Sequence, residues 1–207
     1  MSEAHPNPVD LLKSARRAEL RRALEQLSPQ AREKSSAKIA DQLLEWPVVR
    51  EARTVLSFHP RWDEPDMERV SRALLLRGLC LCLLRYDATV QSYEPRLVAD
   101  YDKDLERGLF GLMEPRATCR IVDWNHLDLV LVPGLGFDLM GGRLGRGKGF
   151  FDRLLVKARA WRCGAAFDFQ ICDSIPMTST DVPMDFIVTS QGLVRCGGGA
   201  DRRVVGK

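Results

Sequence analysis

Basic residues alternate with glycines in a short segment in the second half of the chain, GGRLGRGKGFFDR at 141–153. Its first basic residues are Arg143, Arg146 and Lys148, and its interleaved glycines are Gly142, Gly145, Gly147 and Gly149. Glycine lets backbone N–H groups approach an anion closely, and a helix opening at Phe150 would add the positive end of its dipole. Guanidinium and ammonium groups around the same hollow make phosphate the expected ligand.

The same segment differs from two common phosphate-binding motifs. Gly142-x-x-x-x-Gly147-Lys148 has the spacing of a P-loop, but Gly149 stands where Ser or Thr would hold magnesium. The spacing Gly145-x-Gly147-x-Gly149 is not the dinucleotide pattern G-x-G-x-x-G, and no acidic residue follows in a suitable strand. The glycines alone would also suit a tight connection, so the phosphate prediction depends on the interleaved basic residues.

The segment follows the clearest strand in the sequence. Leu127 to Val132 is almost continuously apolar and ends at Pro133-Gly134, which predicts a strand buried on both faces, as in a parallel sheet. In open α/β sheets, ligands bind beyond the carboxyl ends of the strands. The glycine-rich loop is therefore expected to lie where such a fold binds its ligand.

Helices and strands alternate along the rest of the chain. We expect helices at 11–27, with Asp10 as N-cap, at 29–44, with Ser28 as N-cap, at 67–77 and at 150–160. Strands are expected at 54–58, 79–84, 127–132, 164–167 and 186–189, while 86–120 shows no clear pattern. This order predicts an α/β protein with a mostly parallel sheet between helices.

Composition favours one compact domain. The chain has 207 residues, 45% of them hydrophobic, and a net charge of +3, which does not by itself indicate nucleic acid binding. The six cysteines show no C-x-x-C spacing, so we expect reduced, mostly buried thiols. No apolar run approaches the ~20 residues of a membrane span, and the first residues resemble no targeting peptide, so we expect a cytoplasmic protein. The expected parts are a flexible N-terminus at 1–9, one domain at 10–192 with a helical part at 10–45, and a flexible tail at 193–207.

The glycine-rich loop and its surroundings resemble a known family. PGLGFD at 133–138 followed by GRLGRGKGFFDR at 142–153 closely resembles the signature of the 5-formyltetrahydrofolate cyclo-ligases, also called methenyltetrahydrofolate synthetases. The resemblance covers roughly residues 13–190. Further pieces in family order are Lys13-x-x-x-Arg17, LSP at 27–29, Glu64-x-Asp66, Glu114-Pro115, and Asp181-x-x-x-Asp185 before Ile187-Val188-Thr189.

The resemblance implies a three-layer α/β/α fold related to the ribose-phosphate isomerase and CoA-transferase group. It also implies a monomer that uses ATP and magnesium to cyclise 5-formyltetrahydrofolate, with or without a polyglutamate tail, to 5,10-methenyltetrahydrofolate. ATP's γ-phosphoryl group would pass to the formyl oxygen, N10 would attack the activated carbon, and phosphate would leave. Neither nucleic acid nor a membrane is an expected partner.

Residue roles follow from the same resemblance. The catalytic residues it implies are Lys148 and Arg146. The ATP-binding residues it implies are Lys13, Arg17, Arg143, Gly145, Arg146, Gly147, Lys148, Gly149, Phe150, Phe151 and Asp152. The implied substrate-binding residues are His59, Glu64, Arg146, Lys148 and Phe150, and the implied magnesium ligands are Asp152 and Asp181, since magnesium prefers carboxylates.

Each of these roles has a simpler alternative. Lys13 and Arg17, at i and i+4, could form only a solvated basic helix face. Asp152 could be a first-turn residue favoured by the helix dipole. Glu64 could be an exposed loop acid before a proline, and Phe58 is expected in the core.

Three departures from the family pattern support one rival function. Phe150-Phe151 replaces the usual Tyr-Tyr, Thr180 replaces a frequent His, and 86–100 lacks a Met-rich pattern. One rival is therefore a lapsed cyclo-ligase domain that binds RNA or a protein. A second rival, a small-molecule kinase that would use the near-P-loop spacing, is opposed by Gly149 and by the lack of an acceptor-activating base. The intact glycine-rich loop, Lys13, Arg17 and both aspartates favour the cyclo-ligase.

Overall fold

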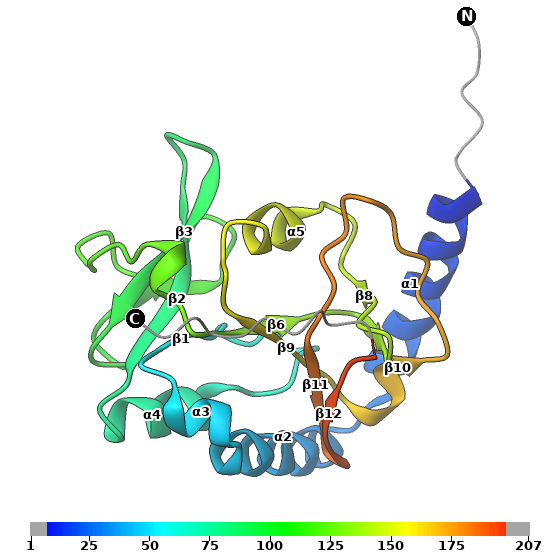
Figure 1. The fold of residues 1–207 in the computed structure, drawn as a ribbon, viewed down its shortest axis with the longest axis horizontal. Coiled ribbons are helices and arrows are strands. Elements are labelled where there is room, and N and C mark those ends of the chain that lie inside the picture. The colour runs from blue at the N-terminus through cyan, green and yellow to red at the C-terminus, as the bar shows by residue number, and fades with distance from the viewer. Residues whose placement is uncertain (1–7, 198–207) are drawn as a thin grey trace, which may run out of the picture.

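The computed structural model describes residues 8–197, which fold around a seven-stranded sheet (Figure 1). The strand order is β12-β11-β9-β6-β1-β2-β3, with parallel neighbours from β11 to β2 and an antiparallel strand at each edge. This confirms the predicted α/β class with a mostly parallel sheet. The strands of the sheet are β1 Thr54–Leu56, β2 Cys80–Asp87, β3 Ser92–Val98, β6 Leu129–Pro133, β9 Trp161–Ala165, β11 Phe186–Thr189 and β12 Gly192–Arg195.

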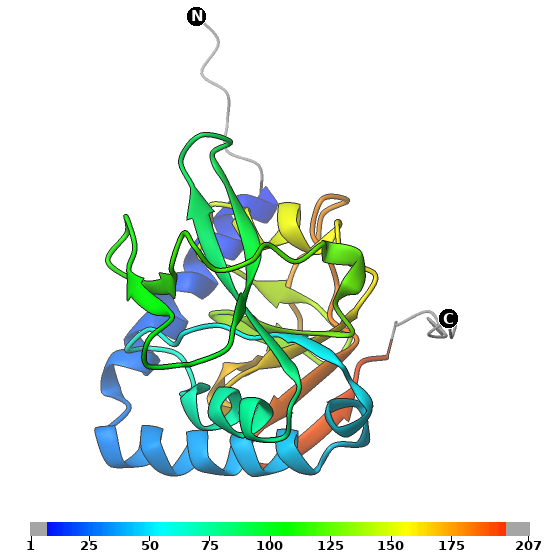
Figure 2. The same ribbon diagram turned by 90° about the vertical axis from the view of Figure 1, so that its left-hand side faces the viewer.

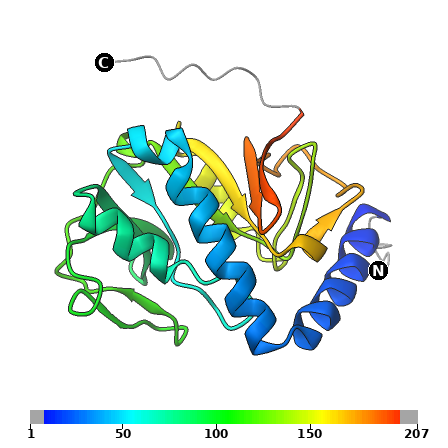
Figure 3. The ribbon, with the colours of Figure 1, turned by 90° about the horizontal axis from the view of Figure 1, so that it is seen from below.

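Helices cover both faces of the sheet. The helices are α1 Pro8–Gln26, α2 Pro29–Glu45, α3 Pro47–Glu51, α4 Glu68–Leu76 and α5 Phe150–Leu155, with 3-10 turns at Trp124–His126 and Asp168–Gln170. Figure 3 shows α2 and α4 across one face, and Figure 1 shows α5 above the other. None of the helices in residues 8–197 is long and apolar enough to cross a bilayer.

Two small sheets complete the fold. One joins β7 Gly136–Asp138 to β8 Arg143–Leu144 and to β10 Ile171–Cys172, and the other pairs β4 Leu105–Arg107 with β5 Met113–Pro115. The long β2–β3 hairpin projects beyond the main sheet (Figure 2). Its first strand was predicted at 79–84, whereas its turn and β3 lie within 86–120, where the sequence showed no clear pattern.

The central strand explains why its sequence is continuously apolar. Leu129 and Leu131 pack into the core beneath α2 and α4, while Val130 and Val132 pack with Leu155 on the opposite face. Side chains alternate between the two faces of a strand, so both sets are buried at once.

Several predicted boundaries differ from the structure. The first helix starts at Pro8, so the prediction of Asp10 as its N-cap was wrong, and Asp10 lies in the first turn. Ser28 does cap α2, since its hydroxyl accepts a hydrogen bond from the Ala31 N–H at 3.2 Å. The helix expected at 150–160 ends at Leu155, because the chain must turn so that Ala158 and Ala160 enter the core before β9.

The C-terminal strand was missed by sequence reasoning. Residues 192–195 form β12 against β11, within the stretch assigned to a flexible tail from 193. A four-residue edge strand followed by glycines carries little pattern, and only the neighbouring strand reveals it. Free thiols agree with expectation, although Cys80 is exposed while Cys82, two residues on, is buried.

Asp138 anchors the turn that precedes the glycine-rich loop. Its buried carboxylate accepts hydrogen bonds from the N–H groups of Met140 at 2.9 Å, Gly142 at 2.8 Å and Ile175 at 2.7 Å. Gly142 must lack a side chain, because a Cβ there would collide with the same carboxylate. One side chain thus ties the β7–β8 turn to the distant segment at 175.

We expect Asp138→Ala to lower the free energy of unfolding by about 3 kcal/mol or more, because two buried N–H groups and one partly buried N–H group lose their acceptor. Urea denaturation followed by circular dichroism would measure the change. Asp87→Ala is the matched control, since Asp87 accepts from the Thr89 N–H at an exposed hairpin tip. An equal loss in both variants would contradict the anchoring role of Asp138.

Candidate active site

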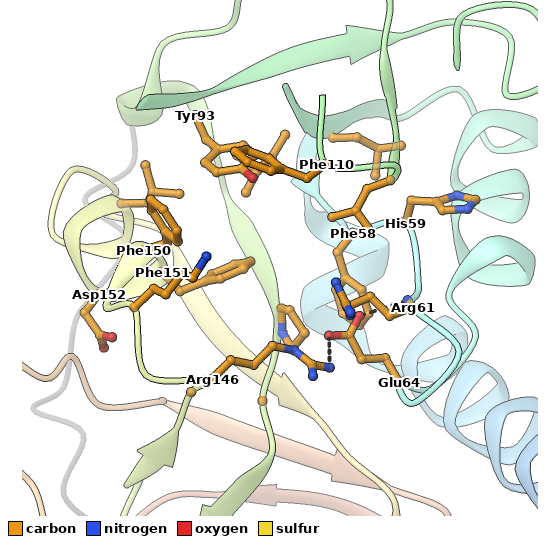
Figure 4. A pocket seen from close by; sticks show the side chains of 18 of the residues that line it. Phe58, His59, Arg61, Glu64, Tyr93, Phe110, Arg146, Phe150, Phe151 and Asp152 are labelled. Carbon is orange, nitrogen blue, oxygen red and sulfur yellow. Dashed lines mark hydrogen bonds and ion pairs between the residues drawn. The ribbon is translucent and has the colours of Figure 1, made fainter. Parts of the chain in front are cut away.

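A cavity of about 520 Å³ lies beyond the carboxyl ends of β1 and β6. The glycine-rich loop borders it, as the strand-end argument predicts. The residues that line it are Arg21, Phe58, His59, Arg61, Glu64, Leu83, Leu84, Tyr93, Phe110, Leu112, Met113, Glu114, Pro133, Gly134, Arg143, Gly145, Arg146, Lys148, Gly149, Phe150, Phe151, Asp152 and Leu154. Figure 4 shows aromatic rings at one end, and Arg146 with Glu64 at the other.

Two glycines of the loop have conformations that require glycine. Gly147 has a φ of 105° and Gly149 a φ of 61°, the latter as the residue before α5. A side chain at either position would strain the backbone. The interval between them holds Lys148 at the rim of the cavity.

The basic residues of the loop differ in what they can offer a ligand. Arg143 is buried, with its guanidinium 2.8 Å from Asp152 Oδ2 and stacked over the Phe151 ring at 5.6 Å. Lys148 is exposed at the cavity and makes no hydrogen bond or ion pair with any other described residue. Lys148 is therefore the loop cation most available to an incoming phosphate.

Arg146 is held by two neighbouring acids. Its guanidinium makes two bonds to Asp63, at 3.0 and 2.8 Å, and one to Glu64, at 3.0 Å (Figure 4 shows the contact with Glu64). Sequence reasoning missed Asp63, because nothing in a single loop acid indicates a partner 83 positions away.

Glu64 lies inside the site, so the alternative of an exposed loop acid was wrong. Its other oxygen accepts a hydrogen bond from the Arg61 N–H at 3.0 Å. Burial raises the pKa of Glu64, and the Arg61 bond and the Arg146 charge oppose that rise. His59 also lines the cavity, where burial lowers its pKa, and its Nδ1 lies 3.1 Å from the Tyr101 hydroxyl.

Lys13 and Arg17 connect α1 to two segments beside the cavity, the segment with Asp181 and the glycine-rich loop. Lys13 is buried, and its Nζ lies 2.5 Å from Asp181 Oδ2, while Arg17 Nε donates to the Gly145 carbonyl at 2.9 Å. Neither residue lines the cavity. A solvated basic face is therefore the wrong description of Lys13, whose charge is neutralised inside the protein.

The two predicted metal ligands lie on adjoining segments. Asp152 Oδ1 accepts a hydrogen bond at 3.3 Å from the N–H of Val182, the residue after Asp181. The described residues contain no group of three or more His, Cys, Asp or Glu side chains that could hold a metal. Two carboxylates nevertheless fit magnesium, which usually takes one or two from the protein and the rest from phosphates and water. Asp185 lies outside this pair, since its carboxylate accepts from the Arg162 N–H in β9.

Aromatic rings form the far wall of the cavity. Phe150 packs edge-on against Tyr93 at 5.9 Å, and Tyr86 bridges Tyr93 at 5.2 Å and Phe110 at 5.0 Å. Tyr93 and Phe110 were missed, because both come from 86–120. Only the β2–β3 pairing brings Tyr93 to the cavity, and only the β4–β5 pairing brings Phe110 there. Phe58, expected in the core, is buried and also lines the cavity.

Comparison with known proteins finds relatives that match most of the chain. The family model described as the 5-formyltetrahydrofolate cyclo-ligase family matches residues 10–190. The Mus musculus 5-formyltetrahydrofolate cyclo-ligase is 26% identical over 195 residues, covering 87% of this chain and 94% of that protein. The corresponding enzyme of Mycolicibacterium smegmatis is 32% identical over 148 residues, covering 69% and 76%.

A solved structure shares the whole architecture. The NMR structure of Aquifex aeolicus 5,10-methenyltetrahydrofolate synthetase matches with a TM-score of 0.82 at 30% identity, covering 92% of this chain and 95% of that one. The family match spans nearly all of the described residues, and the loop that resembles the family signature borders the cavity of about 520 Å³. The chain therefore belongs to the 5-formyltetrahydrofolate cyclo-ligase family.

Proposed function

We propose that the protein cyclises 5-formyltetrahydrofolate to 5,10-methenyltetrahydrofolate while ATP is converted to ADP and phosphate. The observation that carries this proposal is a single cavity with an aromatic wall facing a cationic glycine-rich loop. A flat pterin suits the ring-lined end, and phosphates suit the end with Arg146 and Lys148. Both reactants would therefore meet in one cavity.

The proposed chemistry transfers one phosphoryl group and closes one ring. The formyl oxygen attacks the γ-phosphorus as the bond to ADP breaks, which leaves an iminium phosphate at N5. N10 then attacks the activated carbon, loses its proton, and expels phosphate to form the methenyl bridge. Such transfers depend on positioning and on stabilising developing negative charge, which is the role we assign to Lys148 and Arg146.

The remaining residues would orient the two reactants. The Phe150 and Tyr93 rings would pack against the pterin, and the buried carboxyl of Glu64 could accept hydrogen bonds from it. Phe150-Phe151 lacks the two hydroxyls of the usual Tyr-Tyr, yet both rings line the cavity. That packing supports an active enzyme over a lapsed domain that binds RNA or a protein.

Asp152 and Asp181 are the residues we propose to hold magnesium. A magnesium ion held there would supply positive charge that partly neutralises ATP's phosphates. Asp181 is paired with Lys13, and the recorded bonds of its carboxylate all use Oδ2. We also propose that the enzyme acts as a cytoplasmic monomer.

Lys148→Ala should lower kcat/KM about 100- to 1000-fold, because a charge aimed at the transferring phosphoryl group is lost. The measurement is the near-ultraviolet absorbance of the methenyl product, with 5-formyltetrahydrofolate, ATP and magnesium supplied. Lys157→Ala, an exposed lysine outside the cavity wall, is the control and should retain activity. Full activity in Lys148→Ala would remove this residue from the mechanism.

Asp181→Asn should raise the magnesium concentration for half-maximal activity about 10-fold or more, because one of two proposed ligands loses its charge. Titration of magnesium at saturating ATP would measure the shift. Lys13→Met breaks the same ion pair from the other side but keeps the carboxylate, so it should not raise the magnesium requirement. The assignment of Asp181 fails if both variants shift the requirement equally, since the ion pair alone would then be responsible.

A further inference from the structure

Two carboxylates converge on one guanidinium at the cationic end of the cavity. Asp63 and Glu64 follow β1 in a loop, and Arg146 reaches them from the glycine-rich loop. Both acids are buried, whereas the Arg146 side chain is 33% exposed and lines the cavity. A second cation, Arg61, lies farther off, with its Nε 3.7 Å from Asp63 Oδ1, so Arg146 is, within residues 8–197, the one close cation that both acids share beside the glycine-rich loop.

The two acids hold Arg146 in different ways. Asp63 uses both oxygens, one on each terminal nitrogen, so it fixes the plane of the guanidinium as well as its position. Glu64 contacts Arg146 through Oε1 on Nη2, while its Oε2 accepts from the Arg61 N–H. If Glu64 lost its contact with Arg146, its carboxylate would still accept the hydrogen bond from the Arg61 N–H. Among the described residues, Asp63 has no comparable second partner, because its other recorded ion pair, with the Arg61 side chain, is 3.7 Å long.

The hydrogen bonds of Arg146 to Asp63 and Glu64, here called the clamp, leave some of the N–H donors of Arg146 available to a ligand. A guanidinium has five N–H groups in a rigid plane. The bonds to Asp63 and Glu64 occupy three of them, so Nε–H and one N–H of Nη1 remain for a ligand. An arriving phosphate can use these two groups and can also replace Glu64, whose negative charge it repels.

We propose that Asp63 is the positioning residue for Arg146, and that Glu64 is the partner that a phosphate group displaces from the same guanidinium. Asp63 keeps the fork in place while its open donors meet the phosphate. Glu64, once released, retains its bond to Arg61 and turns its freed oxygen toward the cavity. This inference rests on the proposed function for the identity of the phosphate, which is ATP's.

Binding of ATP alone, measured by calorimetry without folate, tests the first half. Asp63→Asn should weaken ATP binding about 10-fold. One of the two oxygens that accept from Arg146 becomes an NH2 group, which is itself a donor and cannot accept a hydrogen bond from the guanidinium. The same change made in an Arg146→Ala background should alter ATP binding less than about 2-fold, since a positioning residue acts only through its partner. An equal loss in both backgrounds would show a general structural role and overturn the proposal.

Two further variants guard against trivial outcomes. Asp102→Asn breaks a pair of the same two-bond geometry with Arg72, outside the cavity wall, and should leave ATP binding unchanged. If Asp63→Asn fails to fold, ATP binding by Arg146→Lys tests the same proposal, because lysine keeps the positive charge but lacks the planar guanidinium that Asp63 orients. Weak binding like that of Arg146→Ala supports the clamp, and binding like that of the unaltered protein overturns it.

Glu64→Gln tests the second half. Removal of the competing charge should leave ATP binding equal or tighter by a few-fold, whereas a loss of more than about 3-fold would overturn the displacement of Glu64. Turnover of the unaltered protein, measured in parallel, reports separately on the proposed function. Absence of methenyl product with ATP binding intact would reject the cyclisation while these binding tests still decide the role of Asp63.

Discussion

Like charges repel, so a loop that gathers cations for a phosphate needs acids to hold it when no ligand is present. This protein supplies each acid from a different place. Asp63 neutralises Arg146, Asp152 neutralises Arg143, and Asp181 neutralises Lys13. These pairs join α1, the loop after β1, the glycine-rich loop and the segment before β11, and the shape of the cavity depends on that joining.

The pairing also sorts the cations by function. Arg143 is buried beneath the loop and supports it, while Arg146 is clamped but keeps open donors toward the cavity. Lys148 has no internal partner among residues 8–197 and remains for the ligand. Three basic residues with nearly equal spacing thus take three different roles, because each meets a different set of neighbours.

Local patterns foretold much of the fold. Ser28-Pro29 predicts a helix start from local backbone chemistry, without regard to what packs against the helix. The apolar run from Leu127 to Val132 predicts a strand buried on both faces from its residue types alone. The glycine-rich loop could likewise be predicted, because Gly147 and Gly149 have positive φ angles that favour glycine locally. The edge strands β3 and β12 could not be predicted, because each depends on hydrogen bonds from one neighbouring strand.

The sequence by itself determined the fold class, the family signature and the set of cationic and acidic residues from which a phosphate site could be built. Only the tertiary structure decided which acid meets which cation. Asp63 and Arg146 are 83 positions apart, and Lys13 and Asp181 are 168 apart, so no local rule relates them. The aromatic wall likewise needs the β2–β3 hairpin to carry Tyr93 to Phe150. Long-range pairing is set by the packing of the whole sheet, and residue type and spacing do not encode it separately.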